Sequence, residues 1–123
     1  MAYTIIEVAN THGGDINYVK ELILEFSQFK NDFGIKFQPL HPDKLATKDF
    51  EWYLVYQELL FDSSEWSSII DLASETKDIW LDIFDEYGVQ ILEENINKIF
   101  GIKLQVSVLF NYGVLNALSR IDL

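Results

Sequence analysis

Charged and amide side chains interrupt the apolar segments of this chain at positions where they could form a binding site. A charged side chain inside an apolar strand is costly unless it is paired or used by a ligand. A carboxylate and two ammonium groups brought together would suit an anionic substrate, because lysine is a compact positive charge for phosphate or carboxylate. A buried Lys–Glu pair with a purely structural role is the alternative. The residues concerned are Glu7, Lys36, Gln38, Asp82, Lys103 and Gln105.

His12 could serve as a general acid and base or as a metal ligand. Taken alone, it is better explained as a loop histidine that bonds to the backbone, and His41, beside Pro42, as a surface residue. The chain has two histidines and no cysteine. We therefore expect no metal site built from this chain alone. Acidic residues between 82 and 94 are expected mostly to form a solvated helix face.

Composition narrows the class of partner. The chain has 123 residues, nine basic against twenty acidic, and a formal net charge of -11. Nucleic acid and anionic membrane are therefore poor partners. No apolar run approaches ~18 residues, so no membrane span is expected. The absence of cysteine fits a reducing compartment, and no secretory signal is visible, so we expect the protein in the cytoplasm.

Apolar segments typical of buried strands alternate with segments of helical periodicity. Asp15 is a candidate N-cap for the first helix, and Ser63 and Ser64 are candidates for a later one. Pro39 should stop the second strand and open a loop over residues 39–48. We expect strands at 3–8, 33–38, 78–84 and 101–108, and helices at 16–30, 50–61, 65–75, 87–99 and from 111 or 112 to about 119.

This alternation indicates an α/β fold with a parallel sheet and right-handed crossovers. Four strands form only a small open sheet, so the sheet is either capped by a partner or is part of a larger barrel. In such folds, sites lie at the carboxyl ends of the strands. Glu7, Lys36 and Lys103 come from three strands and should meet at that end.

Two segments resemble motifs of the sialic acid (N-acetylneuraminate) synthase family. Residues 5–15, IIEVANTHGGD, are similar to its opening motif E-I-G-x-N-H-x-G, with Glu7, His12 and Gly14 matching and Thr11 where the family usually has Asn. Residues 35–38, IKFQ, are similar to the V-K-F-Q strand of the family. Looser similarity continues, in order, through residues 56–73, 82–92 and 103–118, so the resemblance covers nearly the whole chain.

The resemblance implies a TIM-barrel synthase that condenses phosphoenolpyruvate with an N-acyl sugar such as N-acetylmannosamine. The products are a nonulosonic acid and phosphate, and a divalent metal, manganese or magnesium, assists. By matched position, Glu7 would handle the sugar or its proton transfers, and His12 would shape the loop around it. Lys36 and Lys103 would hold phosphoenolpyruvate, and Gln38 would line the sugar pocket.

The sequence departs from the family pattern on its third and fourth strands. Asp82 and Ile83 stand where the family has a small hydroxyl and proline, and Val106 and Val108 replace a usual Ser and Glu. A carboxylate at position 82 would repel phosphate unless it is protonated or turned away. The family's metal-binding histidines and its C-terminal antifreeze-like domain have no counterpart here, so no cofactor is expected for this chain alone.

A complete barrel needs roughly 250 residues, whereas this chain holds about four βα units. Residues 1–123 are therefore expected to be an N-terminal half-barrel, either a fragment of a longer synthase or a short, degenerate paralogue. We expect the isolated chain not to turn over. A non-catalytic ligand-binding or assembly module is the alternative, and a small α/β protein unrelated to sugars is a third. Two unpaired sheet edges predict a homo-oligomer or completion by a missing half-barrel.

Overall fold

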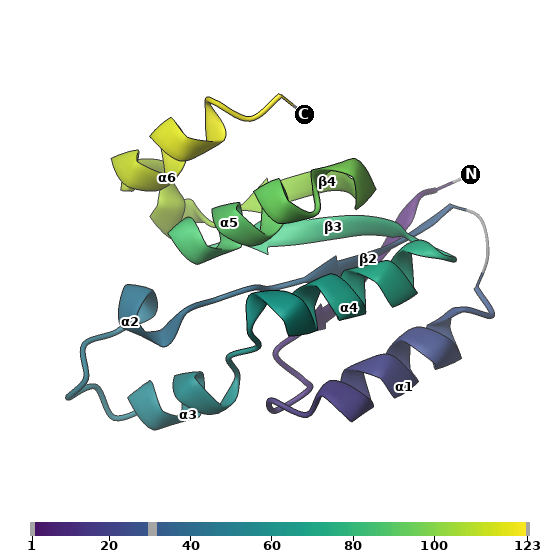
Figure 1. Cartoon of the computed structure of the whole chain (residues 1–123), viewed down its shortest axis with the longest axis horizontal. Coiled ribbons are helices and arrows are strands. Elements are labelled where there is room, and N and C mark those ends of the chain that lie inside the picture. The colour runs from purple at the N-terminus through teal and green to yellow at the C-terminus, as the bar shows by residue number, and fades with distance from the viewer. Residues whose placement is uncertain (1, 30–31, 123) are drawn as a thin grey trace.

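A single parallel sheet organises the computed structural model, which describes residues 2–29 and 32–122. Its strand order is β1-β2-β3-β4, and every neighbouring pair is parallel (Figure 1). The predicted α/β class and parallel sheet are confirmed. The strands are β1 (Thr4–Ala9), β2 (Phe33–Phe37), β3 (Asp78–Ile83) and β4 (Ile99–Leu104).

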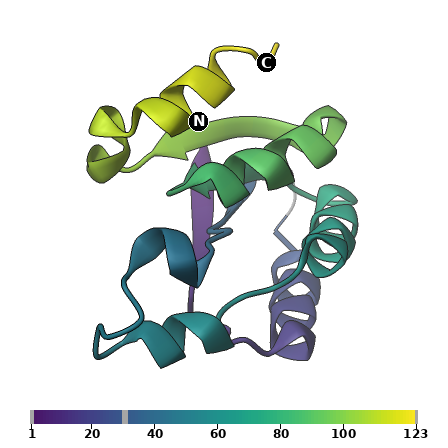
Figure 2. The same cartoon turned by 60° about the vertical axis from the view of Figure 1, so that its left-hand side comes forward.

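Helices connect each strand to the next. Three longer helices connect the strands and follow one another along the sheet in strand order, and a fourth longer helix comes after the last strand (Figures 1 and 2). Two short helices lie in the connection between β2 and α4. The longer helices are α1 (Ile16–Phe26), α4 (Ser63–Ser74), α5 (Glu86–Glu94) and α6 (Tyr112–Leu118); the short ones are α2 (Pro42–Leu45) and α3 (Tyr53–Glu58). No helix of the described ranges is long and apolar enough to cross a membrane.

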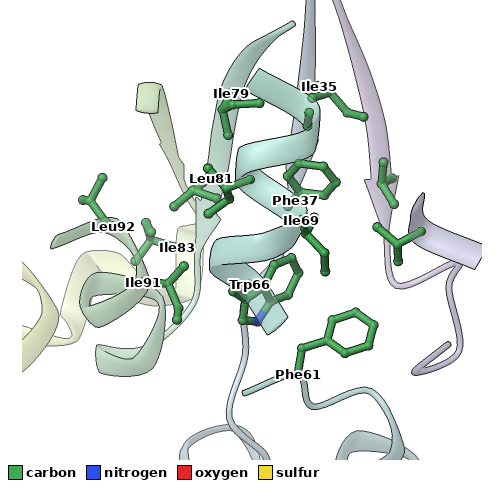
Figure 3. Packing of buried hydrophobic residues seen from close by; sticks show 14 of the residues in the cluster. Ile35, Phe37, Phe61, Trp66, Ile69, Ile79, Leu81, Ile83, Ile91 and Leu92 are labelled. Atoms are coloured by element: carbon green, nitrogen blue, oxygen red, sulfur yellow. The ribbon is translucent and has the colours of Figure 1, made fainter. Parts of the chain in front are cut away.

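The core lies between the sheet and the helices (Figure 3). Alternate residues of a strand point to opposite faces, so Ile79, Leu81 and Ile83 of β3 face the helices together. The predicted apolar side of α4 packs against them, with Ile69 and Ile70 fully buried. Burial of this kind stabilises a fold by roughly 25 cal/mol per Å² of apolar surface removed from water.

The opposite face of the sheet, the open face, carries aromatic and charged side chains. Tyr3, Trp80 and Phe100 contact one another on it, with ring centroids between 5.5 and 6.3 Å apart. Two glycines make room for the indole of Trp80. A Cβ added at Gly101 would lie 2.5 Å from the Trp80 ring, and one at Gly34 would lie 2.7 Å from it. Phe100 is 62% exposed, so this face is partly apolar and open to solvent.

Helix caps agree with expectation at one site and differ at another. The Asp15 carboxylate accepts hydrogen bonds from the backbone of Asn17 and Tyr18, which confirms it as the N-cap of α1. The N-cap of α4 is Asp62, not Ser63 or Ser64. Asp62 accepts from the Glu65 backbone N–H and the Glu65 side chain accepts from the Asp62 backbone, a reciprocal pair that starts the helix at Ser63, two residues before the expected start at residue 65.

Several expected boundaries were wrong. The first helix ends at Phe26, before the end expected at residue 30, which lies outside the described residues. The loop 39–48 contains α2, because Pro42 suits a first helical turn and the His41 ring accepts from the Asp43 N–H. The helix 50–61 shortens to α3.

The expected boundaries of the helix before β4 and of β4 itself differ more from the structure. The helix expected at 87–99 ends at Glu94, where the Asn95 amide donates to Ile91 O, and a 3-10 turn leads directly into β4. The strand expected at 101–108 runs instead from Ile99 to Leu104. A second 3-10 turn (Val106–Phe110) follows, because Val108 turns back to be buried in the core.

Candidate ligand-binding site

Charged side chains from all four strands meet on the open face near the carboxyl ends of the strands. Glu7 of β1 stands beside Lys36 of β2, and Asp82 of β3 stands beside Lys103 of β4. Lys36 Nζ lies 3.2 Å from Glu7 Oε1, and Lys103 Nζ lies 3.1 Å from Asp82 Oδ2. Lys36 Nζ is also 3.9 Å from Asp82 Oδ2. The structure therefore brings the three residues singled out by the sequence to one rim, with Asp82 among them.

Two glutamine side chains complete this group. Gln38 Nε2 donates to Glu7 Oε1 and to Asp82 Oδ2, both at 3.3 Å. Gln105 Nε2 donates to the same Asp82 oxygen at 2.7 Å. We call this group the polar rim; it consists of Glu7, Lys36, Gln38, Asp82, Lys103 and Gln105.

Asp82 is the centre of the polar rim. Its side chain is 0% exposed, and its Oδ2 faces two ammonium groups and two amide donors. Its Oδ1 has no hydrogen-bond partner among the described residues. A buried carboxylate is tolerated only when it is paired, and here it is paired with both lysines.

The charges of the polar rim balance. Glu7 and Asp82 carry one negative charge each, and Lys36 and Lys103 carry one positive charge each. The sequence left open whether a carboxylate at position 82 would be turned away from the anion position. It is not turned away: it lies between the two lysines that the resemblance assigns to phosphoenolpyruvate. Neither lysine is thus free to meet an incoming anion alone.

The expectation of a solvated acidic face between residues 82 and 94 was wrong for two residues. Asp82 lies on a strand and is buried, and Asp85 is also buried. Asp85 accepts hydrogen bonds from the backbone N–H of His41 and of Gly88, so it caps α5 and anchors the loop after β2. Burial raises the pKa of the Asp85 carboxyl, and these two hydrogen bonds oppose that rise.

His12 is placed away from the hydrogen bonds of the polar rim. It is buried, its Nδ1 accepts from the Gly14 N–H at 2.9 Å, and its ring packs on Phe61 at 4.6 Å between centroids. Burial lowers the pKa of the His12 imidazole, which favours the neutral ring. Its Nε2 has no partner within the described part of the chain. These contacts give His12 a role in shaping the loop after β1.

That loop needs its glycine. Gly14 has φ +82°, and a Cβ there would lie 1.8 Å from the carbonyl oxygen of Glu58 at the end of α3. Only glycine adopts this conformation and allows this approach at low cost. The match of Gly14 to the family motif therefore has a structural basis in this chain.

A hollow lies outside the rim, between α2 and the start of α5. It has a volume of about 440 Å³. The His41 ring meets the Tyr87 ring edge-on at 5.7 Å, and His41 also caps α2. His41 is thus part of the structure of the loop as well as a surface residue. The hollow is lined by His41, Asp43, Lys44, Glu86, Tyr87 and Gln90.

The residues present do not fit a divalent metal. Within residues 2–29 and 32–122, no three His, Cys, Asp or Glu side chains lie together in a way that could hold a metal ion. The carboxylates of the polar rim face lysine ammonium groups, which compete directly with a cation. We therefore derive no chemical step through a metal bound by this chain.

The sequence pattern could have shown that Asp82 is central. In DIWLDI, alternation places Trp80 and Asp82 on one face, and the parallel register sets Asp82 beside Lys103. The short acidic segment that follows obscured this signal. Gln105 was singled out as a polar residue of the fourth strand, but it lies just beyond β4, and its amide still reaches Asp82.

Comparisons with known proteins place this fold. No protein-family model and no curated protein sequence matches the chain. Among solved structures, the spore coat polysaccharide biosynthesis protein E from Chromobacterium violaceum ATCC 12472 matches with a TM-score of 0.81 at 21% identity, over 99% of this chain and 39% of that one. The N-acetylneuraminic acid (sialic acid) synthetase from Leptospira borgpetersenii serovar Hardjo-bovis, solved with citrate, matches with a TM-score of 0.79 at 20% identity, over 97% and 41%.

Both matches extend over nearly all of this chain, and the chain spans about two fifths of the length of each solved chain. The four parallel strands and their helices correspond to part of the barrel of these larger proteins. The fold implied by the sequence motifs is therefore found: this chain has a partial-barrel fold similar to that of the sialic acid synthetase.

Proposed function

We propose that this chain is a synthase-like domain of carbohydrate biosynthesis that does not catalyse turnover on its own. Two lines of support agree. The fold is similar to that of a sialic acid synthetase and of a polysaccharide biosynthesis protein. The motif residues Glu7, Lys36 and Lys103 also lie within one ion-paired group on the rim where such folds bind ligands.

For a complete synthase-like domain, we propose the reaction that the resemblance implies, with the phosphate held by groups other than Lys36 and Lys103, because Asp82 already lies between these two lysines. Phosphoenolpyruvate would condense with an N-acyl sugar of the N-acetylmannosamine type to give a nonulosonic acid and phosphate. The citrate in the Leptospira synthetase structure is a carboxylate ligand on this fold, which is compatible with an anionic substrate. Any manganese or magnesium would have to be held largely by groups outside this chain, because the described residues offer no metal-binding cluster.

The lack of turnover by the chain alone rests on one observation. Asp82 is fully buried and its Oδ2 lies 3.1 Å from Lys103 Nζ and 3.9 Å from Lys36 Nζ. A phosphate group placed between these lysines would meet a fixed negative charge. Val106 and Val108 lie in the 3-10 turn after β4, and their side chains add no polar group to the rim.

The second candidate is a non-catalytic ligand-binding or assembly module, and the open face favours it. Tyr3 is 42% and Phe100 62% exposed on a sheet whose edge strands are β1 and β4. Exposed apolar patches of this kind mark association surfaces, and unpaired edges invite pairing. A second copy of the chain, or the remainder of a barrel, would cover this face.

A phosphate-release assay tests the proposal. The chain would be mixed with phosphoenolpyruvate, N-acetylmannosamine and manganese, and phosphate measured against a blank without protein. We expect no release above the blank. Release by the native chain that disappears in Lys36→Met, but persists in the surface control Lys98→Met, would contradict the proposal. Lys98 pairs with Asp71 and is not part of the polar rim. Lys98→Met therefore removes the same charge as Lys36→Met without altering the rim.

Calorimetric titration with N-acetylmannosamine separates a chain that keeps a sugar pocket from a purely structural assembly module. A synthase-like domain that keeps its sugar pocket should bind this sugar, with weaker binding in Gln38→Leu. A purely structural assembly module should show no heat of binding under the same conditions.

A further inference from the structure

The Asp82 carboxylate is surrounded as a bound anion would be. Its Oδ2 lies 2.7 Å from Gln105 Nε2, 3.1 Å from Lys103 Nζ, 3.3 Å from Gln38 Nε2 and 3.9 Å from Lys36 Nζ. Two ammonium groups and two amide donors around one oxygen are what a protein offers to a phosphate or carboxylate ligand. We propose that Asp82 occupies the anion position of the polar rim and is the residue that excludes anionic ligands from this chain.

Asp82 is always present at the site. It is carried on β3, between the strands that carry the two lysines, and stands in register beside Lys103. A group held in place by the fold competes with a free ligand at a high effective concentration. An external phosphate must therefore displace a partner that cannot diffuse away.

Displacing the Asp82 carboxylate from the two lysines is costly. The Asp82 side chain is 0% exposed, and its Oδ1 already lacks a hydrogen-bond partner among the described residues. If a ligand took the lysines, the buried carboxylate would lose its positive partners and face a second negative charge. A buried charge without a partner is strongly unfavourable, and like charges at contact distance repel.

The two lysines of the rim differ in exposure and in their partners. Lys36 is 12% exposed and is held by Glu7 as well as by Asp82, whereas Lys103 is 44% exposed and pairs with Asp82. Without the charge at Asp82, the rim would hold two ammonium groups against the single carboxylate of Glu7. The donors for an anion are thus present, and the Asp82 carboxylate occupies them.

Asp82→Asn is the sharpest test, because asparagine keeps the shape of the side chain and removes its charge. Binding of inorganic phosphate would be measured by calorimetry at neutral pH and constant ionic strength. We expect no measurable binding by the native chain, and a gain in affinity on the order of tenfold or more in Asp82→Asn, the size expected when a close like charge is removed. The gain should disappear in Asp82→Asn combined with Lys103→Met.

Asp71→Asn is the matched control. Asp71 lies on α4, and this change removes its carboxylate from an exposed ion pair with Lys98 while changing the net charge equally. It should leave phosphate binding undetectable, which separates a specific site from a general effect of charge. Circular dichroism would show that each variant is folded.

Three results would overturn the inference. They are phosphate binding by the native chain that Lys103→Met abolishes, no gain in a folded Asp82→Asn variant, and a gain that persists without Lys103. The first measurement needs only the native chain and a lysine variant, so it stands even if Asp82→Asn does not fold. The inference relies on the proposed function only in taking the rim as the ligand site: turnover by the native chain would contradict that function, whereas failure of Asp82→Asn to bind phosphate contradicts this inference alone.

Discussion

Lys103 Nζ of β4 donates to Asp82 Oδ2 of β3 at 3.1 Å, and the two residues stand side by side in the parallel register. The lysine is 44% exposed, whereas the carboxylate is fully buried. The pair therefore joins a partly exposed ammonium group to a buried carboxylate. This relationship explains why the rim is both a structural feature and the candidate ligand site.

Replacing Asp82 by alanine should destabilise the fold. Lys36 would lose one of its two carboxylate partners while remaining mostly buried. Breaking a buried ion pair by removing one partner costs about 3–5 kcal/mol. Urea unfolding should show a loss at or slightly below this range, because Glu7 still holds Lys36.

The comparison for that variant is Asp71→Ala, which removes the carboxylate of the exposed pair with Lys98. Exposed pairs contribute about 0–1 kcal/mol. An Asp82→Ala variant no less stable than Asp71→Ala would show that the rim carries no buried ion pair.

The loop after β1 should tolerate alanine at Gly13 far better than at Gly14. Both glycines have positive φ, +57° and +82° respectively. A Cβ at Gly13 meets nothing within 4 Å, whereas at Gly14 it would lie 1.8 Å from the Glu58 carbonyl oxygen. Gly13→Ala should cost about 1 kcal/mol for its conformation alone, and Gly14→Ala clearly more in chemical unfolding. Equal losses would contradict the close approach of this loop to α3.

Stability should fall as the pH is lowered through the range in which His12 titrates. Burial lowers the pKa of His12 from 6.5, so the unfolded chain binds a proton that the folded chain resists. The stability that His12 contributes is therefore complete above pH 6.5 and is lost as the pH falls toward the folded pKa. Thermal unfolding between pH 7.5 and 5.5 should show this decline.

The control for the pH effect is His12→Asn, whose amide oxygen can still accept from the Gly14 N–H but does not titrate in this range. This variant should show a flatter dependence on pH. A native chain whose stability rises on acidification from pH 7.5 to 5.5 would contradict the burial of a neutral His12.

The open face should drive self-association. Phe100, on the edge strand β4, is 62% exposed and stacks on Tyr3, which directly precedes the other edge strand, β1. Sedimentation velocity at micromolar concentration should show a species larger than the monomer, and Phe100→Ser should shift it toward the monomer. Leu24→Ser, an exposed apolar position on α1, is the matched control and should change nothing. A native chain that sediments as a stable monomer would contradict this prediction.

The sequence was sufficient to predict the class of fold and the strands, because buried strands and helices differ in the period of their apolar residues. The ends of helices and strands were predicted poorly where individual side-chain contacts determine the local backbone conformation. The cap at Asp62 was missed because Ser63 and Ser64 are equally good caps by residue type. β4 was placed too late because residues of high strand propensity continue past Leu104, while burial of Val108 turns the chain away.

The candidate site was predicted in part for a similar reason. Parallel strands bring their carboxyl ends to one edge, so the meeting of Glu7, Lys36 and Lys103 follows from the topology alone. The position of Asp82 between the two lysines depends on the register of β3 against both neighbours. Register is a tertiary property, and the sequence left the direction of this side chain open.

A crystal structure of the native chain grown with phosphoenolpyruvate tests the central claim most directly. The account predicts that the Asp82 carboxylate remains between Lys36 and Lys103 and that the rim holds no phosphate group. A phosphate group bound to both lysines, with the Asp82 side chain rotated away from them, would contradict it.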